Sequence, residues 1–157
     1  MEETRQALIA ELGAATRDYQ RVTDAVDEAV ADRFGVNRTD LRCIDLLFDG
    51  PLSAGRLAEQ AGLSPAATTA LTDRLEAKGY VRRVRDPADR RRVLVELTDL
   101  ARVRAGQAYG PLAAEGEAHL GGYTDEQLLL LRDYLRHGRD LSERHLARLR
   151  EQPPDQG

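Results

Sequence analysis

Six arginines crowd into eleven consecutive positions, and their type and spacing suggest chemistry more clearly than any other group in the chain. They are Arg82, Arg83, Arg85, Arg90, Arg91 and Arg92. Only Asp86 and Asp89 oppose them within this stretch. Guanidinium groups at this density favour phosphate binding, because cations close to a nucleic acid backbone displace its condensed counterions. A solvated charged surface is the simpler alternative.

The net charge of the chain conceals a local basic segment. The 157 residues carry −4 at pH 7. Residues 51–98 contain nine Lys and Arg and six Asp and Glu, a net charge of +3, so the other residues carry −7. Because DNA binding needs a basic surface rather than a basic protein, the acidic total does not exclude it.

The chain contains none of the common catalytic motifs. The sequences GxSxG, GxGxxG and HExxH and the Walker phosphate loop are all absent. The three histidines, His119, His137 and His145, are not spaced with carboxylates as metal ligands are; His137 and His145 leave only a weak metal site open. We therefore expect neither an enzyme nor a bound metal or cofactor.

The sequence carries no sign of export or of a membrane anchor. No stretch approaches 18 consecutive apolar residues, and the acidic N-terminus lacks the features of a signal peptide. Cys43 is the only cysteine, so no internal disulfide can form. We expect a cytoplasmic protein in which Cys43 is a small packing residue.

The apolar pattern predicts long helices at both ends of the chain. In residues 3–34, apolar residues recur at alternating steps of four and three, which is heptad spacing. They are Leu8, Leu12, Ala15, Tyr19, Val22, Val26 and Ala29. A second helix is expected from Thr98 to about residue 120, interrupted by Gly110 and Pro111. A third follows a capping box at Thr124 and runs to about residue 150.

The terminal helices carry more apolar surface than one chain can bury. Leucines on one face of the last helix add to the heptad stripe of the first. They are Leu128, Leu131, Leu135 and Leu141. We expect residues 1–36 and 99–150 to form a dimerisation region and residues 151–157 to be disordered. An intramolecular bundle is the alternative.

The middle of the chain predicts two short helices joined by a tight turn. A helix over residues 39–49 precedes them, with Leu41, Ile44, Leu47 and Phe48 on one face. Residues 53–62 form the first helix of the motif, capped by Ser53, and Gly62 makes the turn. Ser64 caps the next helix, in which Ala67, Leu71 and Leu75 form the expected buried stripe. This spacing is typical of a helix-turn-helix, although a small helical bundle can produce it too.

A β-hairpin is predicted directly after this motif. Residues 80–85 and 90–97 read as strands, and residues 86–89 form the turn between them. A hairpin in this position is a wing. The expected fold is therefore mainly α with a small β-hairpin, a winged helix-turn-helix lobe over residues 37–98.

The stretch from Leu71 to Thr98, LTDRLEAKGYVRRVRDPADRRRVLVELT, resembles the MarR (multiple antibiotic resistance) regulators. The resemblance rests on four pieces in order: DRLE, KGYV, DPxDRR and LT. It implies a homodimer with a winged lobe in each subunit that binds double-stranded DNA at a palindromic operator. It also implies gene repression, often relieved by a small-molecule effector whose identity the sequence does not give. Some members of this family sense peroxide through a cysteine, so a redox-sensing role of Cys43 stays open.

The second helix of the motif is expected to enter the major groove. Its solvent face is predicted to present Ser64, Ala66, Thr68, Thr69, Thr72 and Asp73 to DNA. Single hydroxyls and methyl groups discriminate bases weakly, and Ala70 stands where many family members carry arginine, so more specificity is expected from DNA shape at the wing.

Charged residues around this helix are expected to hold phosphates or to shape the wing. Arg74 is expected to contact phosphate or to pair with a wing aspartate. In the wing, Arg90, Arg91 and Arg92 are expected at the DNA, one of the first two in the minor groove. Asp86 and Asp89 are expected to fix the tip through hydrogen bonds.

These features predict a DNA-binding transcriptional regulator, a repressor associated with the nucleoid when bound. A winged-helix module that binds proteins without reading DNA is the alternative from another functional class.

Overall fold

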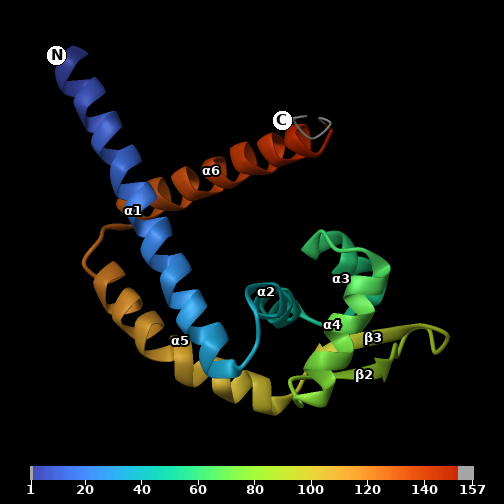
Figure 1. Ribbon diagram of the computed structural model, residues 1–157. Coiled ribbons are helices and arrows are strands. Elements are labelled where there is room, and N and C mark those ends of the chain that lie inside the picture. Colours follow the sequence, from blue (N-terminus) through green and yellow to red (C-terminus); the bar gives the residue numbers. More distant parts are fainter. Residues whose placement is uncertain (1, 152–157) are drawn as a thin grey trace. The chain divides into compact units, whose positions relative to one another are not determined.

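The computed structural model describes residues 2–151, and it is mostly helical with one small sheet (Figure 1). The elements in chain order are α1 (Glu2–Phe34), α2 (Arg38–Leu46), the 3-10 turn η1 (Leu47–Asp49), β1 (Leu52–Ser53), α3 (Ala54–Ala61), α4 (Pro65–Ala77), β2 (Val81–Arg85), β3 (Val93–Leu97), α5 (Asp99–Leu120) and α6 (Asp125–Glu151). This confirms the expected fold class. Residues 152–157, most of the tail predicted to be disordered, lie outside the described residues.

Two compact units make up the chain, and the division falls inside α5. The first ends at Ala108 and the second begins at Tyr109. The first unit therefore contains the helix-turn-helix, the sheet and α1, whose last turns supply Val30, Ala31 and Phe34 to the core. The boundaries predicted from the sequence, at residues 36 and 99, instead enclose the winged helix-turn-helix segment alone.

The core of the first unit lies between the helices and the sheet. Its fully buried large side chains come from α2, η1, α3, α4 and β2. They include Ile44, Leu47, Leu57, Leu71, Leu75 and Val81. Phe48, expected on the buried face with Leu47, is instead 42% exposed, because helix α2 gives way to a 3-10 turn there and the face rotates.

The sheet has three antiparallel strands in the order β1-β3-β2, one strand more than the sequence predicts. In the hairpin, Val81 pairs with Leu97 and Arg83 with Val95. The unpredicted strand β1 pairs Leu52 with Val95 on the other side of β3. With only two residues it has no periodicity of its own, and it exists because β3 offers a free edge.

Side-chain caps begin the helices where the sequence predicts them. The Ser53 and Ser64 hydroxyls accept hydrogen bonds from the Arg56 and Ala67 amides. Before α6, Thr124 Oγ1 accepts from the Gln127 amide and Gln127 Oε1 from the Thr124 amide, a reciprocal capping box. Helix α5 continues through Pro111, so the expected interruption is not a break in the helix.

Candidate nucleic-acid interface

A tight left-handed turn sets helix α4 against helix α3. Gly62 has φ +68°, which glycine adopts without steric cost, and the Leu63 amide donates to the Ala58 carbonyl at 2.9 Å. Ser64 then caps α4, with Pro65 in its first turn. These two helices form the helix-turn-helix that the sequence predicts.

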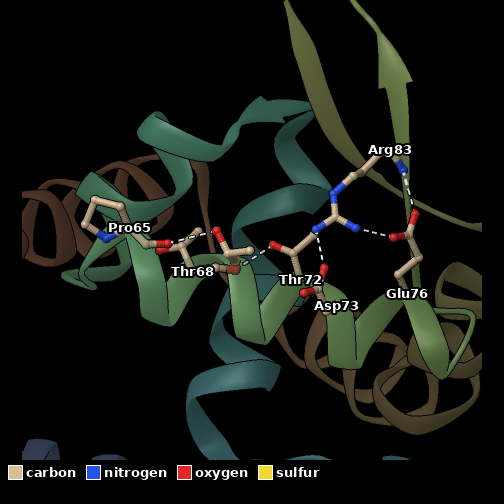
Figure 2. A network of polar contacts seen from close by, with 7 residues as sticks. Pro65, Thr68, Thr72, Asp73, Glu76 and Arg83 are labelled. Atoms are coloured by element: carbon tan, nitrogen blue, oxygen red, sulfur yellow. Dashed lines mark hydrogen bonds and ion pairs between the residues drawn. The ribbon is translucent and has the colours of Figure 1, made fainter.

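Two of the threonines expected to face DNA are buried instead. Thr68 and Thr72 are 1% and 2% exposed and share the inner face of α4 with Leu71 and Leu75, whereas Ala67 is exposed. The Thr68 hydroxyl donates to the Ser64 carbonyl at 3.0 Å. The Thr72 hydroxyl donates to the Thr68 carbonyl at 2.8 Å (Figure 2). The prediction that they point to solvent is wrong, because hydroxyls satisfied within the helix let the rest of the side chain pack.

The other predicted contact positions of α4 lie on its exposed face. Ser64, Ala66 and Thr69 are all exposed, and the Thr69 hydroxyl donates to the Pro65 carbonyl at 3.0 Å. The oxygen of this hydroxyl still has accepting capacity for an outside donor. Ala70, Asp73 and Glu76 are exposed as well, so the exposed part of α4 presents mostly small side chains and two carboxylates.

Arg74 pairs with an aspartate, but not with one in the wing. Its guanidinium lies 2.7 Å from Asp40 on α2; the Asp40 side chain is 4% exposed and the Arg74 side chain 49%. The prediction of a wing partner is therefore wrong. One edge of Arg74 ties α4 to α2, and the rest reaches solvent.

The wing tip is shaped by its two aspartates. Asp86 Oδ1 accepts from the Ala88 amide at 2.8 Å, and Asp89 Oδ1 accepts from the Arg91 amide at 3.1 Å. The backbone closes across the base of the tip, where the Asp86 amide donates to the Arg92 carbonyl at 3.0 Å. These are side-chain-to-backbone turns of the kind the sequence leads us to expect.

The side chains of the six wing arginines divide into three that bond to other groups within residues 2–151 and three that do not. Arg82 pairs with Glu96 across the hairpin at 2.7 Å, and Arg85 donates to the Arg90 carbonyl at 3.1 Å. Arg83 bonds to helix α4. The side chains of Arg90, Arg91 and Arg92 are exposed and make no hydrogen bond or ion pair with any part of residues 2–151. Sequence counting could not separate these sets, because the partners are distant along the chain.

Arg83 joins the wing to the candidate recognition helix (Figure 2). Its guanidinium donates to Asp73 Oδ1 at 2.5 Å and to Glu76 Oε2, and its backbone amide donates to Glu76 Oε1 at 3.3 Å. The hydrogen bond to Asp73 is the main reason that the pKa of Arg83 is raised. We call this set of three hydrogen bonds the Arg83 clamp.

Cys43 is fully buried beside the helix-turn-helix. The pKa of its thiol is raised from 9.0 to about 11, mainly by burial and next by the nearby Asp40 carboxylate, against a smaller lowering by Arg42. A protonated, inaccessible thiol reacts poorly with peroxide.

Tyr80 connects α1, β2 and α5, a role that sequence reasoning missed. Its hydroxyl donates to the Phe34 carbonyl at 2.9 Å and accepts from Arg104 at 2.5 Å. The centroids of the Phe34 and Tyr80 rings lie 5.3 Å apart. Beside them is an open cavity of about 260 Å³ lined by Arg33, Phe34, Arg104 and Gln107.

Residues 2–151 contain neither a cluster of metal-ligating side chains nor a membrane-spanning helix. No three His, Cys, Asp or Glu side chains come together as metal ligands would. Within the same residues, no helix combines the length and the apolar character needed to cross a bilayer.

Comparison with known proteins gives a consistent result. The family model described as "MarR family" matches residues 36–93. The chain is 34% identical over 152 residues to the HTH-type transcriptional regulator YcgE of Bacillus subtilis, covering 96% of this chain and 94% of that protein. It is 30% identical over 112 residues to the HTH-type transcriptional repressor MdtR of Bacillus subtilis, covering 71% and 72%.

Solved structures show the same fold. A MarR family protein from Bacillus stearothermophilus superposes with a TM-score of 0.65 at 21% identity, covering 88% of this chain and 97% of that one. The apo form of MarR from E. coli gives 0.54 at 20% identity, covering 80% and 95%. The chain belongs to the MarR family and is a winged-helix, DNA-binding transcriptional regulator rather than an enzyme.

Proposed function

We propose that the protein is a homodimeric repressor that binds a palindromic operator through α4 and the wing and leaves it when a small molecule binds. The observation that carries the DNA interface is the free arginine group at the wing tip. Arg90, Arg91 and Arg92 are exposed and have no acidic partner within residues 2–151, so approaching phosphates meet uncompensated charge. Arg90 or Arg91 enters the minor groove in this proposal.

On α4, the exposed residues Ser64, Ala66 and Thr69 form the surface that faces the bases, and the solvent-side edge of Arg74 serves a phosphate. Such small side chains read thymine methyls and single acceptors rather than making bidentate contacts. Specificity then comes in large part from DNA shape and deformability at the wing.

The exposed apolar side chains of the terminal helices support the homodimer. In α1, Leu8, Leu12, Tyr19 and Val22 are each more than half exposed. No residue of α6 among those described is buried, although the helix carries leucines along its length. Surfaces of this kind are rare on monomers and typical of an interface, and a second copy of the chain supplies matching surfaces.

The cavity beside Tyr80 supports control by a small molecule. Arg33 and Arg104 bring two positive charges to its lining, and Phe34 adds an apolar surface, so it favours a small anion. Because Arg104 also holds the Tyr80 hydroxyl next to the start of β2, an anion that draws Arg104 away would disturb the base of the wing. Repression itself is supported by the 30% identity to MdtR, which is named a repressor.

The test is a DNA-binding measurement on the full chain with the DNA upstream of its own gene. We expect salt-dependent binding that exceeds binding to random DNA, and a footprint with two half-sites about 10 base pairs apart centre to centre on one face of the duplex. Absence of binding to either DNA at low salt would contradict the proposal. It would favour a winged-helix module that binds proteins in the cytoplasm.

A further inference from the structure

The Arg83 clamp contains negative charges at a place where DNA binding alone would not favour them. Asp73 and Glu76 lie one turn apart on α4, on the helix proposed to enter the DNA groove, and both are substantially exposed, at 61% and 40%. Carboxylates there repel phosphates. The same two carboxylates bind Arg83, whose side chain is 34% exposed.

The clamp also closes an open side of the sheet. Because the strand order is β1-β3-β2, one edge of β2 has no neighbouring strand within residues 2–151, and the Arg83 amide on that edge would otherwise lack a partner there. Glu76 Oε1 accepts from that amide while Oε2 accepts from the guanidinium. A single glutamate of α4 therefore holds both the backbone and the side chain of one wing residue (Figure 2).

We infer that Arg83 is a positioning residue for DNA binding: through Asp73 and Glu76 it fixes the wing relative to α4, and it does not itself contact DNA. The inference rests on the proposed DNA interface. The tip arginines and the exposed face of α4 must meet the same duplex, and the Arg83 clamp sets the orientation of one to the other. A second effect of the same bonds is that one guanidinium offsets part of the charge of two carboxylates on α4.

The decisive variant is the double substitution Asp73→Ala and Glu76→Ala. It removes two negative charges from the proposed interface, so electrostatics alone requires tighter DNA binding. The positioning role requires weaker binding, by about threefold to tenfold, because two ion pairs that orient the wing are lost. Alanine suits a helix interior, so α4 itself is not weakened.

Two further variants complete a mutant cycle: Arg83→Ala alone, and a triple variant that combines Arg83→Ala with Asp73→Ala and Glu76→Ala. We expect Arg83→Ala to weaken binding by a similar factor and the triple variant to bind no more weakly than the double variant, because all three variants lack the same two ion pairs and Arg83→Ala retains only the amide hydrogen bond to Glu76. Glu96→Ala is the matched control: it removes a carboxylate that pairs with Arg82, on the same strand as Arg83, and that forms no ion pair with α4 among residues 2–151, so it should not weaken binding. Thermal unfolding by circular dichroism verifies that each variant is folded.

Hydrogen exchange at the Arg83 amide gives a readout independent of DNA. In the free protein, Glu76→Ala should accelerate exchange at this amide, and Glu96→Ala should not. If the double variant binds DNA as tightly as the parent or more tightly, or if this amide is unprotected in the parent, the positioning role is overturned. If the parent binds no DNA at all, the proposed function fails first, which is a separate result.

Discussion

The guanidinium of Arg74 lies 2.7 Å from the carboxylate of Asp40, and Asp40 is almost completely enclosed while Arg74 is half exposed. Asp40 stands in the first turn of α2, where its backbone amide donates to the Asn37 side chain at 2.8 Å. The pair therefore places a buried negative charge under α4 and neutralises it from the solvent side.

We expect Arg74→Ala to destabilise the protein by about 1–3 kcal/mol, because it leaves a buried carboxylate without its ion-pair partner. Urea unfolding measures the difference. Arg82→Ala, which breaks the more exposed pair with Glu96, is the control and should cost less than about 1 kcal/mol. Equal costs for the two variants would mean that Asp40 finds another partner.

Arg90→Ala and Arg91→Ala should each weaken binding to operator and to random DNA alike. Phosphate contacts carry little sequence information, so each lost contact makes the slope of log affinity against log salt concentration shallower by about one. Binding curves at several salt concentrations measure this. Arg82→Ala removes the same charge from a residue already paired and should change the slope less. If these variants bind DNA with the same affinity and salt dependence as the parent, the tip arginines form only a solvated charged surface and do not contact DNA.

The same substitution at a buried and at an exposed threonine separates packing from base reading. Thr69→Val should lower the preference for operator over random DNA by about 1 kcal/mol or less, because a single exposed hydroxyl is a weak reader. Thr72→Val should leave that preference unchanged, since its hydroxyl bonds only within α4 and is 2% exposed. A loss of preference in the Thr72 variant alone would reinstate it as a DNA contact.

Leu135→Glu should dissociate the proposed dimer. Leu135 is 66% exposed in the single chain, and a carboxylate buried at an interface carries a large desolvation cost. Light scattering should give twice 17.4 kDa for the parent and a smaller mass for the variant. Val93→Glu, at a 52% exposed position in the wing, is the control and should stay dimeric. A parent that is monomeric at micromolar concentration would contradict the dimer.

Cys43 should be inert to mild peroxide at neutral pH, because burial holds its thiol protonated. DNA binding by the parent and by Cys43→Ser should respond equally to peroxide. Release of DNA by the oxidised parent alone would restore the redox-sensing alternative.

The raised pKa of Cys43 also predicts a pH dependence of stability. Below pH 9 the thiol is protonated in both the folded and the unfolded chain, so its contribution to stability is fully present. As the pH rises from 9.0 to about 11, the unfolded chain loses the proton first, and stability falls by about 2–3 kcal/mol. Unfolding of Cys43→Ala across this range should show a smaller decline than the parent. Parallel curves would show that the thiol does not titrate differently on folding.

The sequence predicts the helix-turn-helix and the hairpin because capping serines, Gly62 and alternating valines act locally. The sequence does not predict correctly which face of α4 is buried. Few large apolar residues mark the inner face of this helix, and Thr68 and Thr72 occupy it because their hydroxyls bond to the preceding turn. Sequence reasoning also fails for Arg74 and Arg83. Their acidic partners are determined by tertiary packing, and the charge count of a segment does not contain that information.

The carboxylate that Glu76 places along β2 has a consequence for the behaviour of the protein at high concentration. A sheet edge with free amides is a template for strands of neighbouring molecules and hence for aggregation. On β2, Glu76 occupies the Arg83 amide, and the side chains of Arg82 and Arg85 add positive charge along the same strand. Removing Glu76 therefore exposes an edge on which copies of the wing can stack, so the variants without Glu76 are the ones least suited to concentrated storage.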